Sequence, residues 1–302
     1  MKTFSKSILV AAVALLSSAG AFAQKQEVLT FTRIERNPRA SALAGAGAAS
    51  LSRAAYASFT NAAIIPFYEK TGDFAAGYQY WAPSLGASHA VNAAGAFKFG
   101  AVGVALGGVY QMEQPDFDGF RPSALQVNAG FGAQIASWLG FGVNARFVRE
   151  NLFQGKSNNA FGADVMVLVA PVQGLSVTAG VANLGSSIKD QLKNEYPQPA
   201  SLRVAAAYRL AFAKMHAVEV MVDEDYYYNS KTNAVAFGAE YGFNDMVFAR
   251  VGYRLASQGA AYGSHLGVGL GVQYAGFRLD VSYLTASEVI GNSLCAGLGF
   301  SF

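Results

Sequence analysis

The chain of 302 residues contains a single cysteine, Cys295. One thiol can form neither an internal disulfide nor a cysteine-based zinc site, so a disulfide-rich scaffold and a zinc cluster are excluded. Charged residues are also scarce, at 14% of the chain, and the two signs nearly balance. The lack of a strongly basic surface argues against nucleic acid as a partner.

Long apolar runs are missing as well. After residue 24 no run reaches the roughly 20 residues that a membrane-spanning helix needs. One shorter run opens the chain, where Lys2 and Lys6 precede an apolar stretch at 8–16 and small residues flank Phe22. This pattern is typical of a cleaved secretory signal. We therefore expect residues 1–23 to be a signal peptide.

Apolar residues nevertheless make up 52% of the chain, with 33 glycines, 22 phenylalanines and 15 tyrosines. They alternate with small or polar residues, as in the last segment, where every second residue from Leu294 to Phe302 is apolar or alanine. A period of two indicates strands with two unlike faces. Phe300 and Phe302 then lie on the apolar face and are predicted to form a C-terminal signal for barrel assembly.

Fourteen alternating segments of about ten residues follow one another between residues 71 and 302. Ten residues is the length of a tilted membrane-crossing strand, and bacterial barrels have even strand numbers. Short connections alternate with long ones, including 112–122, 151–158 and 184–200, which is the asymmetry of periplasmic turns and extracellular loops. The sequence predicts an all-β fold, a 14-stranded antiparallel transmembrane β-barrel over 71–302, in the cell outer membrane.

Residues 24–70 do not alternate and are rich in alanine, serine and glycine. Small residues pack closely, so we expect a small plug or hatch segment inside the barrel. The alternative is a periplasmic arm.

One hairpin can be predicted in register. Aligning the apolar faces of 235–243 and 247–255 leaves a three-residue connection and puts Glu240 opposite Arg250, with both side chains inside the barrel. We predict an ion pair between them, because an unpaired buried charge is costly.

No enzyme, metal site or cofactor is predicted. His89, His216 and His265 lie on separate strands without carboxylate or thiol at ligand spacing. Ser264 and His265 are adjacent and point to opposite faces of a strand, which does not suit a hydrolase. The stretch 223–228, three acidic residues before three tyrosines, is either a calcium- or partner-binding loop or a solvated loop beside the aromatic girdle, and we favour the latter.

Several segments resemble the PorV/PorQ family, a branch of the FadL-like fourteen-stranded outer-membrane barrels. They include Phe-Gly-Ala-Glu-Tyr-Gly-Phe-Asn-Asp at 237–245, Ala-Asn-Leu-Gly at 182–185 and Asn-Pro-Arg-Ala at 37–40. The similarity runs through most of the chain after residue 23. It departs from the family at Asn61-Ala62-Ala63, where relatives often carry Asn-Pro-Ala.

The resemblance implies a non-enzymatic role in type IX protein secretion, with a translocon, an attachment-complex subunit or a secreted protein bound at the extracellular loops. Candidate partner-binding residues in these loops are Asp116, Phe117, Phe120, Lys189, Tyr196 and Tyr227. FadL-like relatives suggest an alternative, the transport of hydrophobic small molecules, with a hydrophobic ligand in the lumen. A third hypothesis is a structural or porin-like barrel.

Overall fold

The computed structural model describes residues 27–81, 86–116, 118–153, 156–189, 194–285, 287 and 290–302. The predicted signal peptide at 1–23, residues 24–26 and Phe117 lie outside these ranges. No helix among the described residues is long and apolar enough to cross a membrane.

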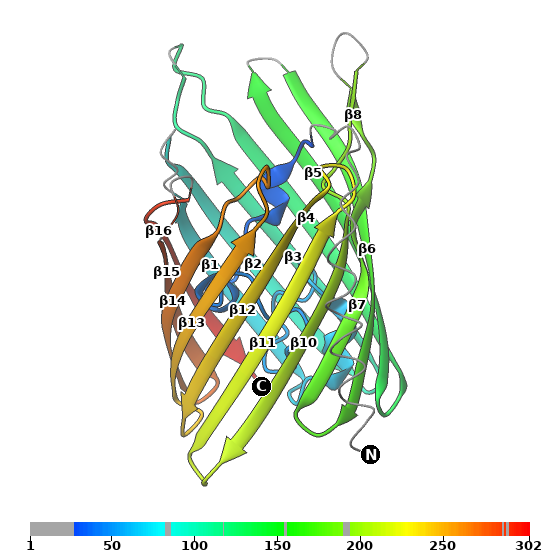
Figure 1. Ribbon diagram of the computed structural model, residues 1–302, viewed down its shortest axis with the longest axis vertical. Helices are drawn as coiled ribbons and strands as arrows, with labels where there is room; N and C mark the ends of the chain where they lie inside the picture. Colours follow the sequence, from blue (N-terminus) through cyan, green and yellow to red (C-terminus); the bar gives the residue numbers. More distant parts are fainter. Residues whose placement is uncertain are drawn as a thin grey trace.

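Fourteen antiparallel strands form a closed, tilted barrel, which confirms the predicted fold class (Figure 1). They are β1 (Gly72–Trp81), β2 (Ser88–Phe99), β3 (Val102–Met112), β4 (Ser123–Ala136), β5 (Leu139–Phe153), β6 (Lys156–Val172), β7 (Leu175–Gly185), β10 (Ser201–Phe212), β11 (His216–Tyr227), β12 (Thr232–Phe243), β13 (Val247–Ala256), β14 (His265–Tyr274), β15 (Phe277–Thr285) and β16 (Ser293–Ser301). Each strand pairs with its neighbours along the chain, and β1 closes the ring against β16.

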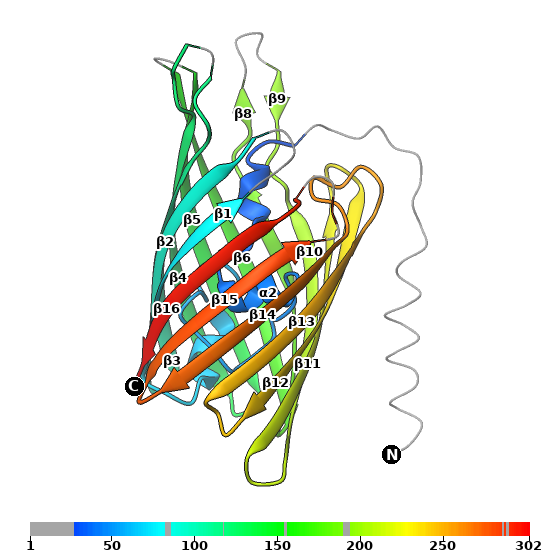
Figure 2. The ribbon, with the colours of Figure 1, turned by 90° about the vertical axis from the view of Figure 1, so that its left-hand side faces the viewer.

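A separate two-stranded hairpin, β8 (Ile188–Lys189) and β9 (Glu195–Tyr196), stands between β7 and β10 and projects beyond the barrel rim (Figure 2). The C-terminus lies at the opposite rim, where the short turns are. By the usual sidedness of outer-membrane barrels, the short turns are periplasmic and the hairpin is extracellular.

The barrel is apolar outside and polar inside. Leu106, Leu270 and Leu298 are 65–66% exposed on the outer face, whereas Gln79, Asn128 and Thr178 are at most 1% exposed on the inner face. In water such an outer surface would be unstable, but against hydrocarbon it is the favourable one. The alternation of the sequence therefore sets which face meets lipid.

Two predicted loops are strand instead. β5 and β6 continue to Phe153 and Lys156, so the long loop expected at 151–158 is mostly a hairpin arm. The acidic residues at 223–225 lie within β11, so the calcium-binding or solvated loop expected there does not exist. In β11 the buried residues Asp223 and Asp225 face the lumen, and their polarity gave the false appearance of a solvated loop.

Residues 27–71 run inside the barrel, as the blue segment in Figures 1 and 2 shows. We call them the lumenal segment. It contains three short helices: η1 (Thr30–Arg33), α2 (Pro38–Ala42) and η2 (Ala62–Phe67).

Inward-facing glycines let the lumenal segment approach the wall. A Cβ on Gly252 would lie 2.1 Å from the Leu43 carbonyl carbon, and one on Gly142 would lie 2.2 Å from the Ala63 backbone nitrogen. Any side chain at these positions would push the segment away from the strands.

Candidate functional site

Asparagine side chains start two of the three helices of the lumenal segment. Asn37 Oδ1 accepts a 3.0 Å hydrogen bond from the Arg39 backbone N–H, and Pro38 follows as the first helical residue of α2. Asn61 Oδ1 accepts an equivalent 3.0 Å bond from Ala63 at the start of η2. Both patterns are usual for helix starts. The first of them places Arg39 on α2, facing strands β11 and β12.

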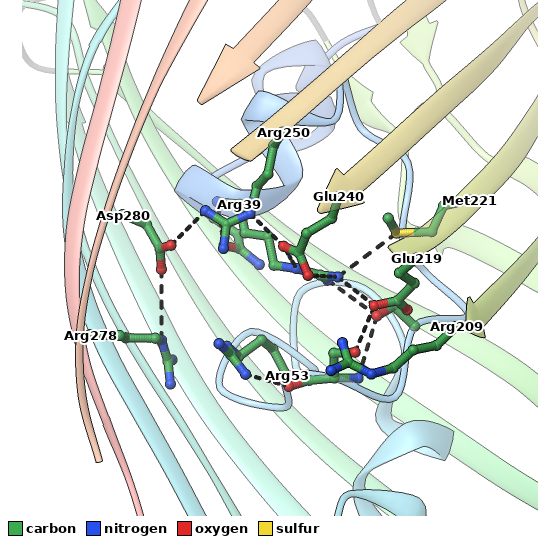
Figure 3. A network of polar contacts seen from close by, with 12 residues as sticks. Arg39, Arg53, Arg209, Glu219, Met221, Glu240, Arg250, Arg278 and Asp280 are labelled. Atoms are coloured by element: carbon green, nitrogen blue, oxygen red, sulfur yellow. Dashed lines mark hydrogen bonds and ion pairs between the residues drawn. The ribbon is translucent and has the colours of Figure 1, made fainter. Parts of the chain in front are cut away.

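A network of ion pairs joins α2 to one half of the barrel wall (Figure 3). Arg39 Nε and Nη2 donate to Glu240 at 2.8 and 3.1 Å, and Nη2 also donates to Glu219 at 2.9 Å. Glu240 accepts from Arg250, its partner across β12 and β13, and Arg250 donates to Asp280 at 2.6 Å. These side chains are nearly inaccessible to solvent. Each buried charge is therefore matched by at least one opposite charge, as burial requires.

Two further carboxylates bind the backbone of the lumenal segment. Asp223 accepts from the N–H groups of Gly47 and Ala48 at 2.7 and 2.9 Å. Asp73 Oδ2 accepts from Ala54 and Ala55 at 2.8 and 2.9 Å, and its other oxygen accepts from Arg278. Hydrogen bonds to a charged acceptor are the stronger kind, so residues 47–55 are fixed to the wall.

On the opposite side of the lumen, the contacts to the segment are apolar and amide-based. η2 packs against β2–β6 through a buried cluster that includes Ile64, Ile65 and Leu168. Asn128 and Asn144 donate to the backbone carbonyls of Ser58 and Ala57 at 2.9 and 3.2 Å. The central part of the segment, residues 36–67, is thus anchored on both sides.

The first described residues, 27–35, are held differently, and we call them the strap. Leu29, Phe31 and Ile34 insert into a buried apolar cluster at the extracellular end of the lumen. Its other members are Trp81, Ala124, Val148, Ala160, Leu284 and Ile290. This cluster puts apolar surface at the extracellular end of the lumen, where a hydrophobic molecule entering from outside would first meet it.

A small number of polar contacts also hold the strap. Arg33 lies 3.3 Å over the ring of Tyr227 and pairs with Glu27 at 2.8 Å. The Val28 N–H donates to the Pro197 carbonyl at 3.1 Å. These contacts join the strap to β11 and to the connection that carries the β8–β9 hairpin.

Glu35 lies where the strap meets the anchored part of the segment. Its side chain lines small cavities shared with Arg203 and Arg254. Burial raises the pKa of Glu35 to about 7, although the two arginines act to lower it. The carboxyl group therefore changes protonation near neutral pH.

Four of the cavities between the lumenal segment and the barrel have volumes of 10 to 40 Å³ each. Spaces of this size hold one or a few water molecules. A fifth cavity, at the extracellular end beside the strap, has a volume of 160 Å³.

The candidate partner-binding residues are scattered. Asp116 is exposed and accepts from the N–H groups of Asp118 and Phe120, so it shapes its own loop. Phe120 and Tyr196 are half-buried, and Lys189 belongs to β8. Tyr227 is 3% exposed and faces the lumen under Arg33, so it does not belong to an extracellular loop surface.

The two C-terminal phenylalanines lie on the outer face at the periplasmic rim. Phe302 is 52% exposed, and its ring covers Gly72 and stacks on Phe74 with centroids 6.1 Å apart. Its carbonyl accepts from the N–H groups of Thr71 and Gly72 at 2.8 and 3.0 Å. Phe300 packs on Phe277 with centroids 4.7 Å apart. Both residues thus lie at the seam where β16 closes on β1.

Sequence reasoning missed the carboxylate of Glu150, although strand alternation puts it inside the barrel with Arg146. It also missed the apolar cluster, because its members come from seven separate segments. Among the residues that the structure describes, no three His, Cys, Asp or Glu side chains lie together as a metal site.

No protein-family model matches the sequence, and no curated protein matches it. Solved structures do match over nearly the whole length. The CymD monoaromatic hydrocarbon channel has a TM-score of 0.67 at 13% identity, covering 91% of this chain and 99% of its own. The Pseudomonas putida toluene transporter TodX has a TM-score of 0.62 at 13% identity, covering 92% and 98%. A Pseudomonas aeruginosa FadL homologue has a TM-score of 0.58 at 9% identity, covering 92% and 97%.

These matches correct the functional prediction. The resemblance to the PorV/PorQ family implied a role in type IX protein secretion, and that prediction is wrong: the similar structures are hydrocarbon channels and transporters, and none of the comparisons supports PorV/PorQ membership. The motifs behind it consist of residues common in barrels. The chain has the FadL-like fold expected from its sequence and is a β-barrel of the outer membrane.

Proposed function

We propose that this protein carries small hydrophobic molecules across the outer membrane. The observation that carries the proposal is the buried apolar cluster at the extracellular end of the lumen. Its position suits a binding site for molecules that arrive from outside. The likeness of the fold to monoaromatic hydrocarbon and toluene channels supports the same function.

In this mechanism the lumenal segment acts as a plug, and the strap occupies the binding site until a ligand replaces it. Leu29, Phe31 and Ile34 fill the apolar cluster, so a hydrophobic ligand would compete with them for the same surface. The strap has few polar contacts, whereas residues 36–67 are fixed by buried ion pairs and backbone hydrogen bonds. The strap is therefore the part of the plug that we expect to move first.

Uptake of radiolabelled toluene tests the proposal, in cells whose outer membrane lacks other hydrocarbon channels. Cells that carry the protein should take up toluene faster than cells with the empty vector. Leu284→Asn adds a polar group to the apolar cluster and should slow uptake, because a hydrophobic ligand cannot satisfy a buried amide. Thr232→Asn is the matched control, since Thr232 is buried on an inner wall position of β12 outside the cluster.

Uptake equal to the empty vector would overturn the proposal, provided the barrel is present in the outer membrane. Equal uptake by Leu284→Asn and the unchanged protein would show that transport does not depend on the apolar cluster. Steady ion conductance in planar bilayers would instead favour a porin-like barrel, which the cavities of 10 to 40 Å³ argue against.

A further inference from the structure

The 160 Å³ cavity lies at the extracellular end of the lumen between the strap and strands β3–β5. Its lining includes the apolar residues Leu29, Phe31, Pro122 and Ala124 and two carboxyl groups, those of Glu113 and Glu150. The cavity therefore combines apolar surface with acidic groups.

Glu150 is the unusual group in this cavity. It faces the lumen on β5 between Ala124 of β4 and Asn158 of β6, and it is only 8% exposed. Among the described residues no hydrogen bond or ion pair reaches its carboxylate, unlike the buried acids of the network around Arg39. A carboxyl group that is largely buried, has no partner in the described part of the chain and lines a cavity favours a ligand that can donate hydrogen bonds to it.

Nearby polar groups do not supply the missing positive charge. Glu113 accepts a 2.6 Å hydrogen bond from Gln111 Nε2. Gln111 in turn accepts from Arg36, whose guanidinium also donates to Gln79. Arg36 is thus engaged with the two glutamines, and no lysine, arginine or histidine belongs to the described lining of the cavity.

We propose that this cavity binds a small hydrophobic amine, with its hydrocarbon part against Leu29 and Phe31 and its ammonium group on Glu150. The inference rests on the proposed function and adds a site beside the strap, which a ligand would occupy before it displaces the strap from the apolar cluster. An ammonium group donates up to three hydrogen bonds. It also carries the positive charge that no described residue supplies to Glu150. A cavity of about 150 Å³ in another protein holds a benzene molecule, so the space here suits one aromatic ring or a short chain.

A matched series of ligands tests the inference. Radiolabelled 2-phenylethylamine, 3-phenylpropionate and ethylbenzene share a similar hydrocarbon part and differ in charge. Each is equilibrated by dialysis against the full-length barrel in nanodiscs, with empty nanodiscs as the blank. We expect the amine to bind at least tenfold more tightly than the carboxylate and than the hydrocarbon.

Three variants locate the effect. Glu150→Gln keeps the shape of the side chain and should weaken amine binding about tenfold or more, which corresponds to about 1.4 kcal/mol. Binding of ethylbenzene by the same variant should be unchanged. Glu150→Asp should retain part of the preference for the amine. Asp118→Asn removes one carboxylate from an exposed extracellular position and should leave all three affinities unchanged.

The outcomes separate this inference from the proposed function. If ethylbenzene binds as tightly as the amine and Glu150→Gln changes nothing, the preference for amines is wrong and hydrophobic transport stands. If none of the three compounds binds above the blank, both proposals fail. Binding of the amine that Glu150→Gln leaves intact would place its site elsewhere and overturn the inference.

Discussion

Arg39 Nε of the lumenal segment lies 2.8 Å from Glu240 Oε2 of β12, a residue 201 positions away in the sequence. The same guanidinium donates to Glu219 of β11, and Glu240 also accepts from Arg250. A single side chain of the segment therefore neutralises carboxylates from two strands. The predicted ion pair between Glu240 and Arg250 is part of a larger network that anchors the lumenal segment.

Replacing Arg39 by methionine should loosen the lumenal segment without opening the barrel. The change leaves Glu219 without its arginine and Glu240 with only one, and removing one partner of a buried pair costs about 3–5 kcal/mol. Chymotrypsin cleavage at Tyr56 and Phe59 should then rise by about two orders of magnitude, if cleavage follows local opening. Arg121→Met, at an exposed loop position, is the control. Unchanged cleavage in Arg39→Met would show that the network does not anchor the segment.

A methyl group at Gly252 should displace α2. It would lie 2.1 Å from the backbone of Leu43, which no small side-chain adjustment can relieve. Hydrogen exchange of the amides at 39–46 should speed up in Gly252→Ala. The barrel itself should stay folded, so its mobility on gels should still change when the sample is heated. Gly108→Ala is the matched control, because the nearest atom to its new Cβ would be 3.6 Å away. Equal exchange in the two variants would show that close packing of Leu43 on Gly252 does not hold α2 in place.

The raised pKa of Glu35 predicts a pH dependence of the strap. The folded pKa of about 7 exceeds the ordinary value of 4.5, so between these values the folded state binds more protons than the released state. The stabilising effect is complete below about pH 4.5 and is lost as the pH rises through 7. The difference is at most about 3 kcal/mol, at 1.36 kcal/mol for each pKa unit.

Hydrogen exchange of the strap amides should therefore be slower at pH 5 than at pH 8, after correction for the intrinsic rate. Arg203, Arg254, Asp223 and Asp225 are the charged groups around Glu35, and all of them keep their side chains in Glu35→Gln. That variant should lose the pH dependence. A dependence that persists in Glu35→Gln would assign it to another group.

Removal of the Phe302 ring should impair closure of the barrel. The ring covers Gly72 and stacks on Phe74, at the seam between the first and last strands. Phe302→Ala should lower the amount of folded barrel in the outer membrane, measured as the fraction whose gel mobility changes on heating. Ile135→Ala, a similarly lipid-exposed position near a periplasmic turn, should not. Equal yields would remove the proposed role of Phe302 in assembly.

The barrel could be predicted from the sequence because the pattern that specifies it, the alternation of apolar and polar residues, lies within each strand. Alternation fixes which face of each strand meets lipid, and a one-residue shift would turn every side chain the wrong way. This rule gave the strand number and the three-residue connection between Phe243 and Val247. The separate interpretation of 223–228 as a loop was wrong, because Asp223 and Asp225 belong to β11 and face the lumen.

The candidate site was less predictable because its contacts join distant segments. Nothing in the sequence near Arg39 indicates that its partners are Glu219 and Glu240. The apolar cluster likewise draws Trp81 and Leu284 together with the strap only after the barrel closes. Glu150 is the exception, since its inward position follows from alternation, but its lack of a partner could not be known without the fold.

A disulfide between the strap and the extracellular rim should stop transport reversibly. The hydrogen bond from Val28 to Pro197 places the two backbones side by side, which suits a disulfide-length link. We expect Val28→Cys with Pro197→Cys, in a Cys295→Ala background, to block toluene uptake when oxidised and to regain it when reduced. Each single-cysteine variant, treated with the same oxidant, controls for damage to the barrel. If the oxidised double variant transports as fast as the reduced one, the strap need not move, and a ligand must reach the lumen by a path that leaves residues 27–35 in place.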